Sequence, residues 1–236
     1  MQKHTIDRRT VPYFSQVSND FIYDAEKFKS FIQNECTPEA LEKQISIKSQ
    51  FEQSKRDTLV KVLKTQYQSV NDNGQILKKI DLLSSPNTFT VTTGHQLNIL
   101  GGPLFFLYKI IHTLKLCEYL NNKHPKQHFI PLFWMASEDH DIEEINHFNL
   151  FNQKISWEEN QGGAVGRYEL MEWDSLIDQI GKMFENSANA EIHDLLKHYN
   201  GKNLGEASFN FVHNLFKDYG LIVLDADHTD LKKLFV

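Results

Sequence analysis

Two β-branched and apolar runs, separated by one helical segment, restrict the fold of this chain more than any other feature. The run 89–93 predicts a strand, and 129–136 predicts a second strand covered on both faces. Between them, a glycine-containing turn over 94–102 leads into a predicted helix over 103–122. A βαβ unit of this kind has parallel strands and a right-handed crossover. The sequence therefore predicts an α/β fold built on a parallel sheet.

The rest of the chain divides into segments of different character around this unit. Apolar residues recur at helical spacing before residue 87, where Thr37-Pro38-Glu39 predicts a capped helix start and Asn71-Asp72-Asn73-Gly74 predicts a turn. The run 221–224 predicts a third buried strand after a helix that Gly220 caps. Mixed, short-ranged patterns between these parts predict a hairpin followed by helices. We expect a helical segment over 1–86 that packs on the core and a first part of the core over 87–147. An inserted α+β segment is expected over 148–203, and a continuation of the core over 204–236.

Three strong parallel strands are fewer than the five or six that a doubly wound domain usually carries. The sequence also stops on apolar residues, Leu234 to Val236, just after a strand and a starting helix. We therefore expect the sequence to be part of a longer protein and to be inactive alone.

Composition excludes several classes of protein. The net charge is −6, with 25 basic residues scattered among 31 acidic ones, which argues against nucleic-acid binding. The two cysteines lie far apart, and the start of the chain has no signal-peptide core. No run of about 18 uncharged apolar residues predicts a membrane span. We expect a cytoplasmic protein without a membrane partner.

The turn after the first strand is a candidate anion site. Glycines let a backbone approach a ligand closely, and the helix that follows directs its positive end toward the turn. The candidate binding residues here are Thr93, Gly94, His95, Gln96, Asn98 and Gly102. The turn matches neither the GxGxxG fingerprint nor a P-loop. The alternative is a tight strand-to-helix turn in which His95 only bonds its neighbours.

An acidic segment, 137–147, follows the second strand and is predicted to lie at the same edge of the sheet. Five acids and a histidine within the seven residues 138–144 cannot all enter a dry core. They could bind Mg²⁺, hold a substrate amine or act as a general base. The candidate catalytic residues are Glu138, Asp139 and His140, with Ser137 as a binding residue. The other acids could equally be ordinary residues of a first helical turn.

The third strand ends in Asp225-Ala226-Asp227, and Asp225 is a candidate contact for a ribose hydroxyl. The alternative is a loop that caps a helix at Thr229. On the helix after the glycine turn, Lys109 and His112 are expected to be solvated. Its apolar residues are expected to pack in the core: Leu104, Phe105, Leu107, Ile110, Ile111 and Leu114.

Several of these residues carry a resemblance to a known family. The segments concerned are Thr93-Gly94-His95-Gln96, Gly102-Pro103-Leu104, Tyr108-Lys109-Ile110, the block from Phe133 to Ile145, the opening Val11-Pro12-Tyr13-Phe14-Ser15 and the strand from Gly220 to Asp225. Together and in this order they resemble the bacillithiol biosynthesis cysteine-adding enzymes, BshC. Phe133–Ile145, which reads FWMASEDHDIEEI, is the most specific of these segments.

The resemblance implies a Rossmann-like core akin to class I aminoacyl-tRNA synthetases, with a helical coiled coil that dimerises. It implies ligation of L-cysteine to the glucosamine amine of glucosaminyl malate. Residues 94–98 then occupy the position of a HIGH-type phosphate-binding motif, with one histidine kept. ATP with Mg²⁺ is the expected co-substrate, and no permanently bound cofactor or structural metal is expected.

Two other functions remain open from the residues alone. Asp139, His140, Asp141 and His147 could form the site of a metal-dependent hydrolase, although a second, distant ligand cluster is absent from the pattern. A non-catalytic module could bind a nucleotide or sugar acid at the same sheet edge. Each function requires the glycine turn and the acidic segment to meet in space.

Overall fold

The computed structural model describes residues 4–34, 37–70, 74–184 and 190–235. The chain divides into two compact units, 1–50 and 51–236. The first unit contains the helices α1 (Gln16–Tyr23) and α2 (Pro38–Lys48) with short 3-10 turns. As predicted, Thr37 caps α2, because its hydroxyl accepts a hydrogen bond from the Ala40 amide and Pro38 follows it.

The second unit is built on a parallel three-stranded sheet with the order β1-β2-β5. Its strands are β1 (Thr88–His95), β2 (His128–Met135) and β5 (Ile222–Asp225). The predicted α/β class and all three predicted strands are confirmed. The middle strand, β2, is covered on both faces, and six of its eight residues are buried.

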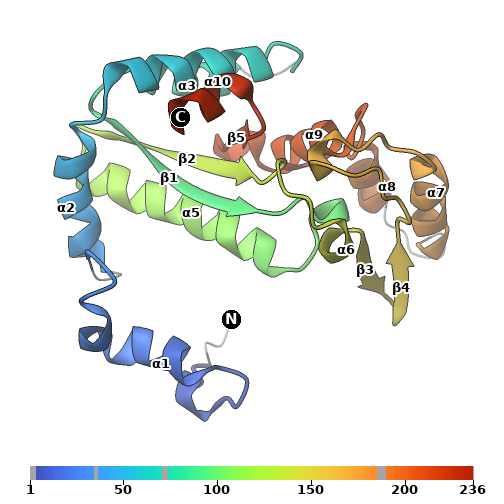
Figure 1. Cartoon of the computed structure of the whole chain (residues 1–236), viewed down its shortest axis with the longest axis horizontal. Coiled ribbons are helices and arrows are strands. Elements are labelled where there is room, and N and C mark those ends of the chain that lie inside the picture. The colour runs from blue at the N-terminus through green and yellow to red at the C-terminus, as the bar shows by residue number, and fades with distance from the viewer. Residues whose placement is uncertain (1–3, 35–36, 71–73, 185–189, 236) are drawn as a thin grey trace. The chain divides into compact units, whose positions relative to one another are not determined.

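Helices cover both faces of this sheet, as Figure 1 shows with α3 above it and α5 below it. The α5 helix packs on β1 and β2, whereas α3, α4 and α9 contact β5. The helices of this unit are α3 (Gln53–Gln66), α4 (Gly74–Leu82), α5 (Phe105–Lys123), α6 (Ile142–Ile145), α7 (Trp173–Met183), α8 (Ala190–Lys197), α9 (Leu204–Phe216) and α10 (Thr229–Lys232). Gly220, with φ 71°, ends the helical run before β5 as predicted.

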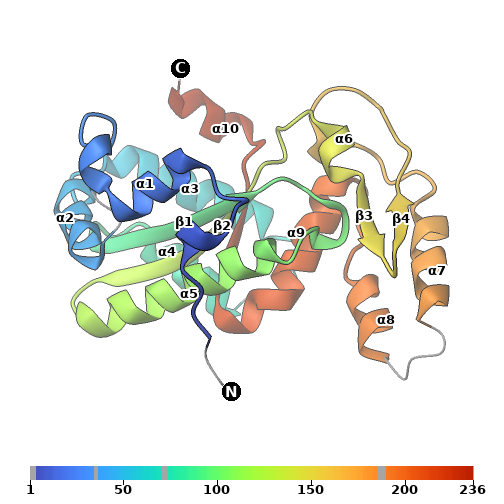
Figure 2. The same cartoon turned by 90° about the horizontal axis from the view of Figure 1, so that it is seen from below.

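The predicted hairpin is present beside the sheet and is followed by two helices (Figure 2). It consists of the antiparallel strands β3 (His147–Leu150) and β4 (Gln153–Ser156). Stacked and edge-on rings hold this part together, since Trp173 contacts Trp157 at 5.4 Å and Tyr199 at 5.0 Å between ring centroids. These rings belong to the same buried cluster as the residues of the main sheet, so the inserted segment shares its core.

Three predictions about helix interiors were wrong. Leu104, Phe105 and Ile111 were expected in the core, yet 64%, 52% and 46% of their respective surfaces are exposed. The α5 helix lies on the sheet with one face only, and the buried positions recur every three or four residues. The remaining face of α5 consequently carries apolar side chains into solvent.

The chain before the sheet also differs in detail from the prediction. Residues 49–52 separate α2 from α3, and the predicted turn at Asn71-Asp72-Asn73 lies outside the described residues. Within the described part of the chain, no helix is both long enough and apolar enough to cross a membrane.

A buried tyrosine joins α3 to the sheet and gives the first test of this fold. The Val223 amide of β5 donates a hydrogen bond of 2.8 Å to the Tyr67 hydroxyl, and 1% of the Tyr67 surface is exposed. Tyr67→Phe leaves that amide without this acceptor, so we expect a loss of about 1–3 kcal/mol in the free energy of unfolding. Urea denaturation measures it. Tyr219→Phe, at a site that is 67% exposed, is the control and should change stability by less than about 0.5 kcal/mol. Equal effects of the two changes would contradict the assigned role of Tyr67.

Candidate functional site

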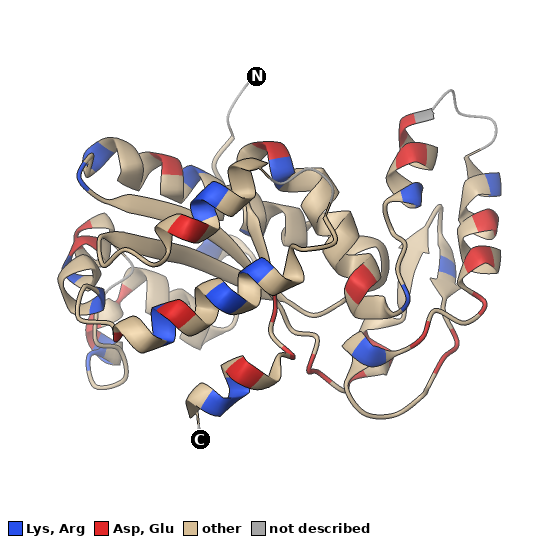
Figure 3. Ribbon diagram, turned by 90° about the horizontal axis from the view of Figure 1, so that it is seen from above, with Lys and Arg blue, Asp and Glu red and all other residues tan. Residues whose placement is uncertain are grey.

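The three parallel strands end at the same level, and this places their following loops together. His95 at the end of β1 pairs with Met135 at the end of β2, and Met135 pairs with Asp225 at the end of β5. The loops that follow therefore begin side by side at the carboxyl edge of the sheet, where α/β proteins bind ligands. Acidic positions continue along the connections at this end of the unit (Figure 3).

The glycine turn and the acidic segment are in direct contact, which confirms the convergence that the sequence predicted. Gln96 Nε2 donates hydrogen bonds to Asp139 Oδ2 at 3.0 Å and to Glu144 Oε2 at 2.8 Å. The side-chain Nδ2 of Asn98 donates to the Glu144 carbonyl at 3.4 Å, and the backbone amide of Ala136 donates to the His95 carbonyl at 3.1 Å. Gln96 and Asn98 therefore join the two loops, which is a role the sequence did not assign to them.

Asp139 is the most constrained acid of the predicted catalytic group. Its carboxylate accepts hydrogen bonds from Gln96 and from the backbone amides of His140 and Asp141 at 2.7 and 3.2 Å. Burial acts to raise the pKa of Asp139, but these hydrogen bonds outweigh it and hold the pKa below its ordinary value. Asp139 is thus ionised at neutral pH and suited to positioning. The side chains of Glu138 and His140 are exposed.

Asp139, His140 and Asp141 also form a group of potential metal ligands. One ligand atom from each lies within 4.8 Å of the others, and no further group of three in the described residues meets this condition. His147, the fourth residue of the hydrolase hypothesis, is outside the group, and its Nδ1 contacts Asn146 Oδ1 at 3.0 Å. Since two of the three ligands are exposed and Asp139 already accepts three hydrogen bonds, this arrangement gives the hydrolase little support.

The glycine turn is tightly wound on its own backbone. Leu100, Gly101 and Gly102 all have positive φ angles, at 52°, 86° and 66°. A Cβ on Gly102 would lie 2.5 Å from Asn98 Cβ, so the turn has no room for one. The amides of Gly101 and Gly102 donate to the carbonyls of Asn98 and Ile99. These two amides therefore hold the turn and are not directed at a ligand.

His95 lies between the turn and α5, half-buried against two aromatic rings. Its ring centroid is 5.0 Å from that of Phe105 and 5.8 Å from that of Phe106, and its Nδ1 contacts the Gln96 carbonyl oxygen at 3.1 Å. Burial lowers the pKa of His95, so its imidazole is neutral at pH 7. Any contact that it makes with an anion is therefore a hydrogen bond without a full positive charge.

The neighbouring strand residues are held by the sheet and by α5. Thr93 and Gly94 are half-buried and pair with Phe133 and Trp134 of β2. Lys109, expected to be solvated, instead donates a hydrogen bond from Nζ to the Gly94 carbonyl. That prediction was wrong because α5 packs on β1 and brings Lys109 to the strand end. His112 is exposed, as expected.

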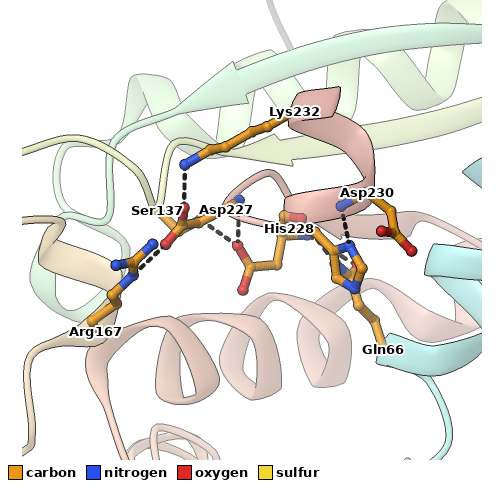
Figure 4. A network of polar contacts seen from close by, with 8 residues as sticks. Gln66, Ser137, Arg167, Asp227, His228, Asp230 and Lys232 are labelled. Carbon is orange, nitrogen blue, oxygen red and sulfur yellow. Dashed lines mark hydrogen bonds and ion pairs between the residues drawn. The ribbon is translucent and has the colours of Figure 1, made fainter. Parts of the chain in front are cut away.

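The second half of the edge is a polar network between the ends of β2 and β5 (Figure 4). The Ser137 hydroxyl, in a side chain that is fully buried, donates to Asp225 Oδ1. The Asp227 amide contacts both Ser137 Oγ at 3.2 Å and Asp225 Oδ1 at 3.0 Å. Gln66 of α3 pairs with the Asp225 backbone in both directions. The helix expected at Thr229 is present as α10, and its cap is His228 at the end of this loop.

Asp227 binds two cations at this edge. Arg167 Nε donates to its Oδ2 at 2.6 Å, and Lys232 Nζ donates to Oδ1. Burial acts to raise the pKa of Asp227, but Arg167 and Lys232 outweigh it and lower that pKa. Sequence reasoning missed Gln66, Arg167 and Lys232, which come from segments with no motif of their own. Gly166, which precedes Arg167, was the one local signal.

A family model and several known proteins match most or all of this chain. Residues 1–236 match the model of a family described as "Bacillithiol biosynthesis BshC, N-terminal Rossmann-like domain". A protein of Flavobacterium johnsoniae named "Putative cysteine ligase BshC" is 40% identical over 100% of this chain and 45% of its own length. Proteins of the same name from Flavobacterium psychrophilum and Cytophaga hutchinsonii are 39% and 41% identical, over 95% and 76% of this chain. They are matched over 43% and 33% of their own lengths, so the chain spans less than half of these relatives.

Close packing at the end of β2 gives a structural test of the site. A Cβ added to Gly166 would lie 2.6 Å from Ser137 Cβ and 2.8 Å from the Ser137 carbonyl oxygen. We therefore expect Gly166→Ala to lower the free energy of unfolding by about 1–3 kcal/mol. Urea denaturation measures the loss. The control is Gly74→Ala, where no heavy atom lies within 4 Å of the new Cβ, and it should be neutral or slightly stabilising. A neutral Gly166→Ala would show that this packing is looser than described.

The lowered pKa values of Asp139 and Asp227 give a prediction about acid stability. A carboxylate whose folded pKa is below its unfolded pKa stabilises the fold above the unfolded value, and this contribution is lost as pH falls through the folded value. Stability should therefore decline as pH falls from about 5, near and below the unfolded carboxyl pKa of about 4. Asp227→Asn should make that decline shallower in urea midpoints measured from pH 7 to pH 3. Asp178→Asn, at an exposed site on α7, should leave the slope as in the wild type. Identical slopes for wild type and Asp227→Asn would contradict the prediction.

Proposed function

The chain belongs to the BshC family through its N-terminal Rossmann-like domain, and from this premise we propose that it forms part of a cysteine ligase. The proposed reaction joins the carboxyl group of L-cysteine to the glucosamine amine of glucosaminyl malate. One structural observation supports it most: the loops after three parallel strands meet at one edge and bring together acids, amides and a histidine. Such an edge can hold two small polar substrates side by side.

Amide formation at neutral pH needs an activated carboxyl group, and we propose that ATP with Mg²⁺ supplies it. In this scheme the cysteine carboxylate attacks the α-phosphorus, pyrophosphate leaves and an acyl adenylate forms. The sugar amine, after losing a proton, attacks the acyl carbon, and AMP leaves as the amide bond closes. The domain contributes positioning of the two substrates and a group that accepts the proton.

We propose distinct roles for the three predicted catalytic residues. Asp139 positions the acidic segment, because its oxygens already accept hydrogen bonds from Gln96 and two backbone amides. Glu138 is the general base, since its exposed carboxylate has no hydrogen bond or ion pair among the described residues. His140, exposed and within 4 Å of Asp139 and Asp141, contacts the substrate.

The binding residues divide between the two halves of the edge. Thr93, Gly94, His95 and Gly102 line the carboxylate or phosphate side in this proposal, with Gln96 and Asn98 holding the turn against the acidic segment. Ser137 and Asp225 form the other side. A homodimer formed through a coiled coil, and a cytoplasmic location, are proposals for the full-length protein.

The activity is tested on the full-length protein with L-cysteine, glucosaminyl malate and ATP-Mg²⁺, followed by mass spectrometry of the coupled thiol. We expect the thiol to form, and Glu138→Gln to lower kcat about 100-fold or more with little change in KM for cysteine. Asp141→Asn, an exposed neighbour, is the matched control and should retain most of kcat. Failure to form the product with every nucleoside triphosphate would refute the ligase. A larger loss of kcat in His140→Asn than in Glu138→Gln would refute the assignment of the base.

A further inference from the structure

Arg167 belongs to the inserted segment, and the two residues before it are hydrogen-bonded to the acidic segment that follows β2. It ends a 3-10 turn, Val165–Arg167, whose first two amides bond to the acidic segment. The Val165 amide donates to the Asp139 carbonyl at 2.7 Å, and the Gly166 amide donates to the Ser137 carbonyl at 2.9 Å. The position of Arg167 is therefore fixed relative to the two loops that make the candidate site.

Close backbone contacts surround this turn on both sides. Gly166 lies against Ser137, and a Cβ on Gly205 of α9 would come within 2.9 Å of the Gly166 carbonyl oxygen. The turn is thus inserted between the end of β2 and the first turn of α9, without space for side chains at either glycine. A backbone held this tightly gives the next side chain a defined starting point.

The Arg167 side chain is both exposed and anchored. It is 71% exposed, whereas the carboxylate of its partner Asp227 is 8% exposed. The ion pair uses Nε of the guanidinium. The two terminal amino groups have no hydrogen bond among the residues that the structure describes. A planar guanidinium held through Nε can offer those groups to a second, bidentate acceptor.

An anion suits these donors, because the guanidinium is charged and its two terminal groups are unused. Asp227 is the shared partner of two cations, Arg167 and Lys232, which approach it from two sides in Figure 4. Together with the nearby Asp225, this makes two carboxylates facing two cations, so the charge of the network is balanced at this point of an otherwise acidic rim. The nearby Asp225 carboxylate accepts hydrogen bonds from the Ser137 hydroxyl and the Asp227 amide through the oxygen Oδ1.

We infer that Arg167 binds an anionic group, a carboxylate or a phosphate, of the small molecule that occupies this sheet edge. Asp227 positions the guanidinium, and Ser137 and the Gly166 backbone fix its distance from the acidic segment. The identity of that molecule rests on the proposed function, in which the substrates carry carboxylates or phosphates. With its anionic end bound to Arg167, the substrate would direct its amine toward Glu138 and the neighbouring acids, which attract it.

The test is isothermal titration calorimetry on the full-length protein with three probes used singly, each of which carries a carboxylate or phosphate (the anionic probes): glucosaminyl malate, L-cysteine and ATP. Methyl glucosaminide is the control for glucosaminyl malate, because it has the same sugar amine but an uncharged methyl group in place of the malate. Arg167→Gln should weaken at least one anionic probe by about 10- to 100-fold, because a charge-assisted hydrogen bond is lost. The probe that weakens identifies the source of the anion, and methyl glucosaminide should bind both forms alike.

Two further variants separate binding from folding. Arg167→Lys keeps the charge and should recover a substantial part of the lost affinity, which a purely structural role would not predict. Lys182→Gln removes an exposed cation from α7 and should bind every probe as the wild type does. Arg167→Gln should lower the urea midpoint only slightly, because Lys232 still pairs with the Asp227 carboxylate, and the affinities are compared without denaturant, where both forms are folded.

The inference is overturned if Arg167→Gln binds all three anionic probes as tightly as the wild type, or if none of them binds the wild type. Its failure is distinguishable from that of the proposed function. Arg167-dependent binding without formation of the coupled thiol would sustain the anion site and refute the ligase. Formation of the thiol with unchanged KM values in Arg167→Gln would do the reverse.

Discussion

The parallel register of β1, β2 and β5 is the constraint on which the candidate site depends. Because His95, Met135 and Asp225 lie in one row across the sheet, three loops that are distant in sequence start at a common edge. Backbone hydrogen bonds of a parallel sheet fix this row, and a slip of one residue would turn every neighbouring side chain to the opposite face. The contacts from Gln96 to the acidic segment, and from Ser137 to Asp225, exist only in this register.

Ionised carboxylates near this row serve two different purposes, and hydrogen bonding separates them. Asp139 and Asp227 are partly withdrawn from solvent, and each keeps its charge because amides or cations surround it. Both act as fixed acceptors that hold loops in place. Glu138 directly precedes Asp139 in sequence, and its side chain is exposed. The chemistry proposed for this edge therefore falls to an acid next to the strand end that the fold does not already use.

Local sequence pattern was sufficient for the strands, for the Gly220 and Thr37 caps, and for the meeting of the glycine turn with the acidic segment. Each of these follows from alternation of residue types, backbone geometry or the topology of parallel strands. Arg167 and Gln66 were beyond such reasoning, because their partners lie 60 and 159 residues away in sequence. The environment of Lys109 depended on the angle at which α5 packs, and that angle is a property of the whole core.

The inserted segment is joined to the loops after β2 and β5 and to α9 by three contacts. Gly166 packs between Ser137 and Gly205, and Arg167 bridges to Asp227 on the loop after β5. An insertion attached only by its chain ends would move independently of the sheet edge, since flexible loops of this length are easily accommodated. Backbone hydrogen bonds to the carbonyls of Ser137 and Asp139 remove that freedom. The carboxyl edge of the sheet therefore presents an exposed guanidinium that Asp227 holds in place. The same edge carries the acids of the segment after β2. This combination of charges suits a substrate with an amine at one end and an anionic group at the other.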